Sequence, residues 1–172
     1  MKSNVVIIGF MGVGKTEVSK ALAKRLSMEL LDTDALIEKK EGMTVSEIFA
    51  KKGEPYFRDL ETKLLEELDE SGRRIISTGG GMVLREDNVK RLKELGPLIL
   101  LTASPEVIEK RLSKVADRPL LNVPDRGGKI REILDVRGPI YDRVADFTVD
   151  TGITNIKEAV EKILDYLKRS SK

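Results

Sequence analysis

The feature that most constrains this chain is the segment Gly9–Thr16, which has the pattern G-x-x-x-x-G-K-T. The apolar run Asn4–Gly9 leads into it and predicts a buried strand, and Thr16–Leu26 follows it with the apolar spacing of a helix. Between a strand and a helix, this pattern turns successive backbone N–H groups toward the helix N-terminus, where they bind phosphate. The segment therefore predicts a nucleotide-binding loop, with a plain glycine turn as the alternative.

Backbone and side chains of this loop have different expected roles. Gly12, Val13 and Gly14 supply N–H groups around the phosphate oxygens, and Lys15 reaches the β- and γ-phosphates. The Thr16 hydroxyl offers a ligand to Mg²⁺. The use to which the phosphate is put must be sought elsewhere in the sequence.

Length and composition limit the classes of protein in question. The 172 residues suit one domain, and a net charge of +2 is too small to predict binding to nucleic acid or to an anionic membrane. No apolar run approaches the roughly 20 residues of a membrane span, and no signal sequence is expected before the first strand. Without cysteine or histidine, a general base must be a carboxylate or a lysine. We expect a cytoplasmic enzyme, monomeric by default.

Strand-like and helix-like runs alternate along the chain, which predicts an α/β fold with a parallel sheet covered on both faces. The expected strands are Val5–Gly9, Leu30–Asp32, Arg74–Ser77, Pro97–Leu101 and Ala145–Val149. The expected helices include Val45–Glu70 and Lys129–Arg143. Between helices, Lys114–Gly128 is polar and rich in proline and glycine, which predicts a long mobile loop.

Polar residues directly follow the first three expected strands. Because ligands gather beyond the carboxyl ends of parallel strands, the phosphate loop, Asp32–Asp34 and Ser77–Gly81 should meet at one edge of the sheet. Asp32 and Asp34 point to the same side if the backbone stays extended. We expect one carboxylate near the hydration shell of the metal and the other on an acceptor hydroxyl. Alternatively, Asp34 only caps a helix over Ala35–Lys40.

Two further groups invite a functional interpretation. Arg58 and Glu61 are three residues apart and share one helix face, although a solvated surface ion pair is the commoner arrangement. Gly79, Gly80 and Gly81 together cost conformational entropy, which predicts a close approach to that backbone. The alternative for the glycines is a plain turn.

Three arginines are candidates for phosphate or carboxylate recognition, because the guanidinium group is a planar fork of donors. Arg111 ends the helix before the long loop, Arg118 lies inside that loop, and Arg137 lies in the following helix. Since the chain has 31 Lys and Arg residues, each of these arginines has a solubilising role as its alternative.

Taken together, these motifs resemble those of the shikimate kinase family, over nearly the whole chain. The matching segments are Gly9–Thr16, Asp32–Asp34, Phe57–Glu61, Gly79–Gly81, Asp117–Leu121, and Arg137 with Tyr141. The resemblance implies a three-layer P-loop kinase fold with a five-stranded parallel sheet in the order 2-3-1-4-5. It also implies a substrate-binding helical region at about 34–61 and a lid at about 113–124. The implied activity is Mg²⁺-assisted transfer of the γ-phosphoryl group of ATP to the 3-hydroxyl of shikimate, in aromatic amino acid biosynthesis.

On the ATP side, the resemblance implies that Lys15 binds the β- and γ-phosphates and that Thr16 ligates Mg²⁺. Asp32 would bind the metal through water. Arg118 would close over the phosphates, and Arg111 would stack on adenine.

On the acceptor side, the resemblance implies that Asp34 bonds the attacking hydroxyl and acts as its base. Arg58 and Arg137 would pair with the carboxylate of shikimate, and Gly79–Gly81 would line its pocket. Glu61 would orient the arginines.

Two segments depart from the family pattern. Asp150–Asn155 lacks the Arg or Pro that the family usually has beside adenine, so the resemblance does not assign adenine contacts to this segment. Gly127-Gly128 is expected to lengthen the hinge of the lid. Gluconate kinase and nucleoside monophosphate kinase are the related alternatives, and a regulatory nucleotide-binding module without catalysis is the alternative from another class. Such a module would be expected to lack Lys15, Asp34 or Arg118, and this chain has all three.

Overall fold

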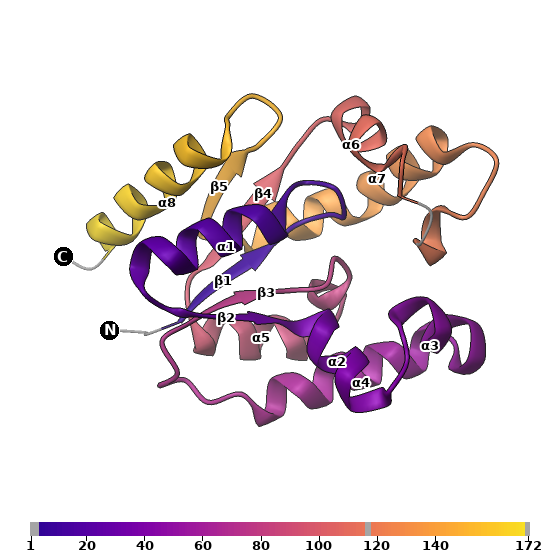
Figure 1. The fold of residues 1–172 in the computed structure, drawn as a ribbon, viewed down its shortest axis with the longest axis horizontal. Helices are drawn as coiled ribbons and strands as arrows, with labels where there is room; N and C mark the ends of the chain where they lie inside the picture. Colours follow the sequence, from indigo (N-terminus) through magenta and orange to yellow (C-terminus); the bar gives the residue numbers. More distant parts are fainter. Residues whose placement is uncertain (1–3, 116–117, 171–172) are drawn as a thin grey trace.

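A parallel five-stranded sheet forms the centre of the computed structural model, which describes residues 4–115 and 118–170 (Figure 1). The strands lie in the order β2-β3-β1-β4-β5, and every neighbouring pair is parallel. Their bounds are β1 Val5–Ile8, β2 Glu29–Asp32, β3 Arg74–Ser77, β4 Leu98–Thr102 and β5 Phe147–Asp150. The predicted α/β class and the strand order implied by the resemblance are confirmed.

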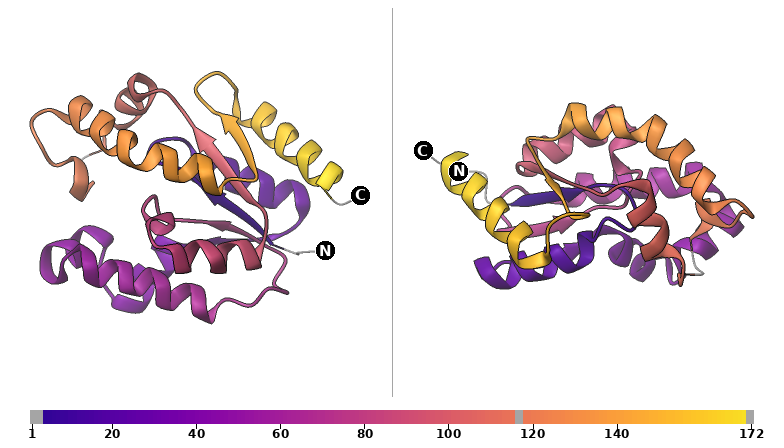
Figure 2. Two further views of the ribbon diagram at one scale, coloured as in Figure 1. Left: turned by 180° about the vertical axis from the view of Figure 1, so that it is seen from behind. Right: turned by 90° about the horizontal axis from the view of Figure 1, so that it is seen from above.

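Helices cover both faces of this sheet and complete three layers (Figure 2). α1 and α8 pack together on one face, whereas α5 and α7 lie on the other. The placement of α1, α5 and α7, which connect strands of the sheet, agrees with right-handed crossovers between parallel strands. The bounds are α1 Lys15–Leu26, α2 Thr33–Glu41, α3 Val45–Lys52, α4 Glu54–Glu67, η1 Met82–Leu84, α5 Glu86–Leu95, α6 Pro105–Leu112, η2 Pro119–Leu121, α7 Arg126–Val144 and α8 Ile156–Ser170.

The main core lies on both sides of the central strands. Val6, Ile7 and Ile8 of β1 are fully buried, as are Leu98 and Ile99 of β4. These strands are continuously apolar because neither face of the sheet reaches solvent. The buried strands fix the edge from which the phosphate loop and the polar residues after β2 and β3 extend.

A second, smaller core lies within α2, α3 and α4, which project beyond the carboxyl end of β2 (Figure 1). It consists of Ile37, Ile48, Phe57 and Leu64. The three helices therefore form a separately packed block beside the main core, at the place where the helical region of about 34–61 was expected.

One predicted helix is two helices in the structure. The stretch Val45–Glu70 breaks at Gly53, whose φ of +83° and ψ of 164° are incompatible with a continuing helix. Pro55 then stands in the first turn of α4, where its missing N–H costs nothing. The uninterrupted apolar periodicity concealed this change of direction.

The prediction of a long loop over Lys114–Gly128 is wrong at its end, because α7 already begins at Arg126. Asp125 caps this helix by accepting from the N–H of Gly128. Gly127 and Gly128 therefore belong to the first turn of α7 and do not lengthen a hinge. Within the expected lid, residues 116 and 117 lie outside the described residues, and with them Asp117 of the matched segment.

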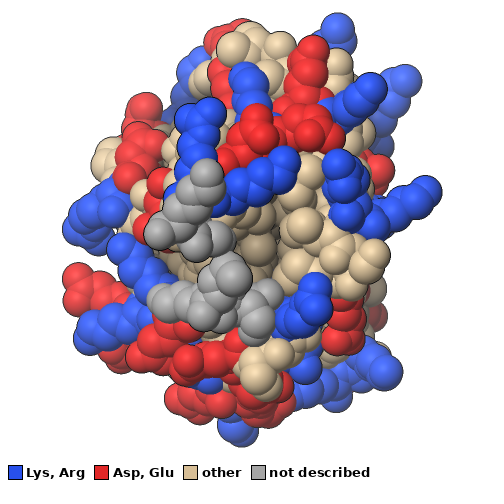
Figure 3. All heavy atoms as spheres, turned by 90° about the vertical axis from the view of Figure 1, so that its left-hand side faces the viewer, with Lys and Arg blue, Asp and Glu red and all other residues tan. Residues whose placement is uncertain are grey.

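Charged side chains of both signs are intermixed on the face that carries the chain ends (Figure 3). This distribution agrees with the balanced composition. Within residues 4–115 and 118–170, no helix is long and apolar enough to cross a membrane.

Candidate active site

The phosphate loop, the residues after β2 and the residues after β3 meet at one edge of the sheet, as predicted. They line a cavity of about 530 Å³ together with Arg111 and Arg118 from the other side. Lys15, Thr16, Asp32, Asp34 and the backbone of Gly79 and Gly80 all face it. The parallel sheet thus gathers residues that are up to about a hundred positions apart in the sequence.

Glycine is required in the phosphate loop by its backbone conformation. Gly12 has a φ of +78° and Gly14 a φ of +92°, both in the left-handed region. Gly14 is the N-cap of α1, so that helix begins at Lys15 and directs its N-terminus toward the cavity. The side chain of Val13 is buried in the core, and Thr16 is exposed in the first turn. This arrangement suits an anion at the start of α1.

Lys15 is held against the loop by its own ammonium group. Its Nζ donates to the carbonyl oxygens of Gly9 at 2.7 Å and Phe10 at 2.9 Å. Burial lowers the pKa of Lys15 to about 8, although the nearby carboxylate of Asp34 opposes the change. A phosphate in the cavity would therefore restore a favourable charge environment for this lysine.

Asp32, not Asp34, is the N-cap of α2. The Oδ1 of Asp32 accepts from the N–H of Ala35 at 3.1 Å, so the interpretation of Asp34 as a helix cap is wrong. Asp34 lies in the first turn of α2, and its Oδ1 is buried without a hydrogen-bond partner among the described residues. Burial raises the pKa of Asp34, helped by the charge of Asp32 and opposed by Lys15. Asp34 is thus available to accept a proton from a bound group.

Arg58 and Glu61 form a buried pair, so the alternative of a solvated surface pair is wrong. Arg58 Nη1 donates to Glu61 Oε2 at 2.7 Å, and Nη2 donates to Glu54 Oε1 at 2.9 Å. The Glu61 side chain is fully buried, and its Oε1 has no partner among the described residues. Burial raises the pKa of Glu61 to about 7 against the opposing charge of Arg58.

The glycines after β3 make room for these charged groups. A Cβ at Gly79 would lie 2.7 Å from Asp34 Oδ1 and 2.9 Å from Glu61 Oε1, and a Cβ at Gly81 would lie 2.3 Å from the Arg58 guanidinium. Neither glycine has a positive φ, so space and not backbone conformation requires them. The predicted close approach is confirmed at Gly79 and Gly81. At Gly80 the nearest atom would be 3.5 Å away, which is ordinary contact.

Arg137 and Tyr141 approach the same glycines from α7. The Tyr141 hydroxyl donates to the carbonyl of Gly80, and a Cβ at Gly80 would lie 3.7 Å from Arg137 Nη1. Both side chains are buried, which raises the pKa of Tyr141. Tyr141 and Arg137 therefore both lie against the backbone of Gly80.

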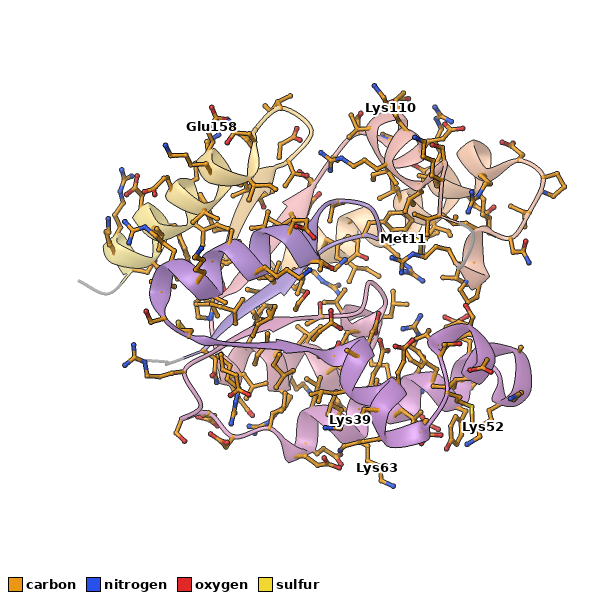
Figure 4. The ribbon with its side chains drawn as sticks, in the orientation of Figure 1. Met11, Lys39, Lys52, Lys63, Lys110 and Glu158 are labelled. Atoms are coloured by element: carbon orange, nitrogen blue, oxygen red, sulfur yellow. The ribbon has the colours of Figure 1, made fainter. Side chains whose placement is uncertain are left out.

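The cavity at the phosphate loop is called the phosphate cavity below. A second, smaller cavity adjoins it and is called the acceptor cavity. Asp34, Arg58, Glu61, Gly79–Gly81 and Arg137 all line it, and so do Arg118 and Met11. Met11, labelled in Figure 4, lies at the tip of the phosphate loop, where it borders both cavities. Arg118 borders both as well, and its Nε is buried without a partner among the described residues.

A third cavity, of about 610 Å³ and largely apolar, lies on the outer side of the phosphate loop. Arg111 borders it and ties its wall to the loop, because Nη1 donates to Gly12 O at 3.2 Å and Nη2 to Thr151 O at 2.7 Å. The Thr151 hydroxyl donates to Val13 O at 2.6 Å. Sequence reasoning missed Thr151. Its only signal was its position directly after the last strand, in the segment Asp150–Asn155 whose contacts were open.

A phosphate loop that opens onto a separate, buried and charged acceptor cavity is the arrangement of a P-loop kinase for small molecules. The family model described as shikimate kinase matches residues 11–168 of the chain. The chain belongs to the shikimate kinase family.

Individual relatives agree over nearly the full length. The shikimate kinase of Thermodesulfovibrio yellowstonii is 46% identical over 98% of this chain and 96% of its own length. That of Pelotomaculum thermopropionicum is 50% identical over 96% of this chain and 95% of its own. The structure of Acinetobacter baumannii shikimate kinase in complex with shikimate is 36% identical, with a TM-score of 0.93, over 98% of this chain and 94% of that one.

We predict that Gly81→Ala weakens acceptor binding more than Gly80→Ala does. The added methyl at Gly81 would displace the Arg58 guanidinium, whereas at Gly80 it would meet only ordinary contacts. The KM for the acceptor should rise about tenfold in Gly81→Ala, the loss expected for one charge-assisted hydrogen bond. Steady-state kinetics measures this, and an equal KM for both variants would contradict it.

We also predict that Glu61 makes stability depend on pH. Its pKa is raised from 4.5 to about 7, so the folded protein binds the proton more tightly than the unfolded chain. This contribution is complete below pH 4.5 and is lost as the pH rises through about 7. Relative to Glu61→Gln, the wild type should lose on the order of 3 kcal/mol between pH 5 and pH 8. Urea unfolding of both proteins measures the difference, which parallel stability curves would refute.

Proposed function

We propose that this protein transfers the γ-phosphoryl group of ATP to the 3-hydroxyl of shikimate, which gives shikimate 3-phosphate and ADP. This is a step of aromatic amino acid biosynthesis, and we place it in the cytoplasm with the protein acting as a monomer. The observation that carries the proposal is the cluster of buried Arg58 and Arg137 with half-buried Asp34, directly beside the phosphate loop. It combines two fixed cations for a carboxylate with one proton acceptor for a hydroxyl.

ATP occupies the phosphate cavity and the apolar third cavity in this proposal. The backbone of Gly12, Val13 and Gly14 and the ammonium of Lys15 bind the phosphates. Adenine lies in the apolar cavity bordered by Arg111, beside Thr151. Because Arg111 and Thr151 bond the loop carbonyls, the base and the phosphates are bound by one connected structure.

Mg²⁺ is the metal that the available donors fit. Thr16 and Asp32 contribute oxygen atoms to the phosphate cavity, and oxygen is the donor that Mg²⁺ prefers. When bound, the ion supplies positive charge to the β- and γ-phosphate oxygens. Thr16 would ligate it directly and Asp32 through water, since the Asp32 carboxylate already caps α2.

Shikimate presents its carboxylate to Arg58 and Arg137 and its 3-hydroxyl to Asp34. Glu61 orients Arg58 through the bond at 2.7 Å, and the bare backbone of Gly79–Gly81 admits the ring. Asp34 accepts the hydroxyl proton as the oxygen attacks phosphorus. Its raised pKa makes it a stronger base than an exposed aspartate.

Charge that spreads over the transferring phosphoryl group meets Lys15 and Arg118. Phosphoryl transfer depends mainly on such positioning and charge stabilisation. We assign Arg118 to a lid of about 113–124 and the acceptor helices to a substrate-binding region of about 34–61, within one domain of residues 1–172. A lid of this kind would exclude water and limit wasteful hydrolysis of ATP.

ADP release tests the choice of acceptor. We expect release with shikimate and none with gluconate or nucleoside monophosphates, because only shikimate would match both the carboxylate pair and the position of Asp34. Each acceptor is offered separately with MgATP in a coupled assay. Release with gluconate alone would identify a gluconate kinase, and no release with any acceptor would favour the regulatory module.

Asp34→Asn separates chemistry from binding. The amide keeps the shape of the side chain but cannot take up the proton, so kcat should fall by about 100-fold or more. Affinity for ATP should change little, and equilibrium nucleotide titration serves as the control. If the variant turned over at nearly the wild-type rate, Asp34 would not be the base.

A further inference from the structure

Arg126, the first residue of α7, bonds three backbone carbonyls that lie outside its own helix. Nη1 donates to Leu112 O at 3.3 Å, Nη2 to Val115 O at 2.7 Å and Nε to Leu121 O at 3.2 Å. Leu112 and Val115 precede Arg118 in the chain, and Leu121 follows it. One rigid guanidinium therefore joins the two sides of the stretch that carries Arg118.

The charge of Arg126 does not serve the helix that it begins. A cation at the N-terminus of α7 lies at the positive end of that helix dipole, which is unfavourable. Leu112, however, is the last residue of α6, so the same guanidinium lies at the negative end of α6. The position of the side chain is thus explained by α6 and the residues after it.

The start of α7 is itself fixed against α6. Gly127 is buried, and a Cβ there would lie 2.7 Å from the carboxylate oxygens of Glu109 on α6. One turn further on, Arg131 Nη2 pairs with Glu106 Oε1 at 2.8 Å. The backbone that carries Arg126 is therefore held against α6.

Arg118 is connected to these anchor points. The N–H of Leu121 donates to the carbonyl of Arg118 at 2.9 Å, and the Leu121 side chain is buried in the main core. Arg118 borders both the phosphate cavity and the acceptor cavity. A shift of Leu121 or Val115 would consequently move the Arg118 guanidinium relative to both.

We propose that Arg126 is a positioning residue for phosphoryl transfer, which fixes Leu112, Val115 and Leu121 and thereby holds Arg118 between the two cavities. Its kinetic effect rests on the proposed function, whereas its effect on the backbone does not. Sequence reasoning gave Arg126 no role.

Backbone hydrogen exchange tests the structural half without any acceptor. In Arg126→Ala, the amides of Val115 and Leu121 should exchange about tenfold faster or more, because the carbonyl anchors are lost. Arg131→Ala is the matched control, since it breaks another contact between α6 and α7 and should leave both amides unchanged. Unchanged exchange in Arg126→Ala overturns the proposal, whatever the protein phosphorylates.

A double-mutant cycle with shikimate tests the catalytic half. Arg126→Ala should lower kcat by about 10- to 100-fold, the effect of displacing a catalytic group by about an ångström, with little change in the KM for shikimate. In the Arg118→Ala background the same substitution should lower kcat less than about twofold, because the two residues act in series. Arg126→Lys keeps the charge but not the three-way fork, so it should recover only part of kcat.

The outcomes separate the two proposals. If wild type releases no ADP with shikimate, the proposed function fails and the exchange measurement still decides the role of Arg126. If wild type is active but Arg126→Ala keeps its kcat, or loses as much in the Arg118→Ala background, Arg126 does not act through Arg118. A melting temperature for each variant identifies a loss of kcat that is due to unfolding.

Discussion

Charged groups from three helices converge on the backbone of Gly79–Gly81, and burial couples their charges to one another. Asp34 and Glu61 face Gly79 with oxygens that have no hydrogen-bond partner among the described residues, while the Arg58 guanidinium lies against Gly81. Buried charges are costly unless they are paired, so this cluster holds free energy that a ligand with matching groups can recover. The charges of the acceptor cavity therefore matter more for ligand binding than its shape.

On the phosphate side of the site, hydrogen bonds from distant side chains hold the loops in place. Arg111 and Thr151 bond the carbonyls of the phosphate loop from two other elements, and Arg126 bonds the residues on either side of Arg118. In each case a side chain from a helix or a strand end fixes backbone within or directly beside an irregular segment. Catalysis by positioning requires such fixed loops, because small displacements of charge are expensive in rate.

Much of the fold and of the candidate site could be predicted from the sequence, and the predictions that were wrong have physical causes. The phosphate loop and the apolar strands were recognisable because local pattern alone determines them. The break at Gly53 was not recognisable, because the apolar periodicity of a helix continues through it. The start of α7 at Arg126 was not recognisable either, because the two glycines that follow it are typical of a loop. Burial of the Arg58–Glu61 pair was also undetermined, since spacing along a helix does not say what covers that face.

The sequence by itself determined the chemistry: a loop for phosphate, carboxylates as the available bases, and glycines where something must come close. Its local patterns sufficed because backbone conformation and residue type are properties of short segments. Only the tertiary structure decided that Asp32 caps α2 and that Asp34 faces the cavities, since that depends on the donor that each carboxylate reaches. It also decided that Arg126 serves α6 and the segment of Arg118, because contacts between residues distant in the chain arise only from packing.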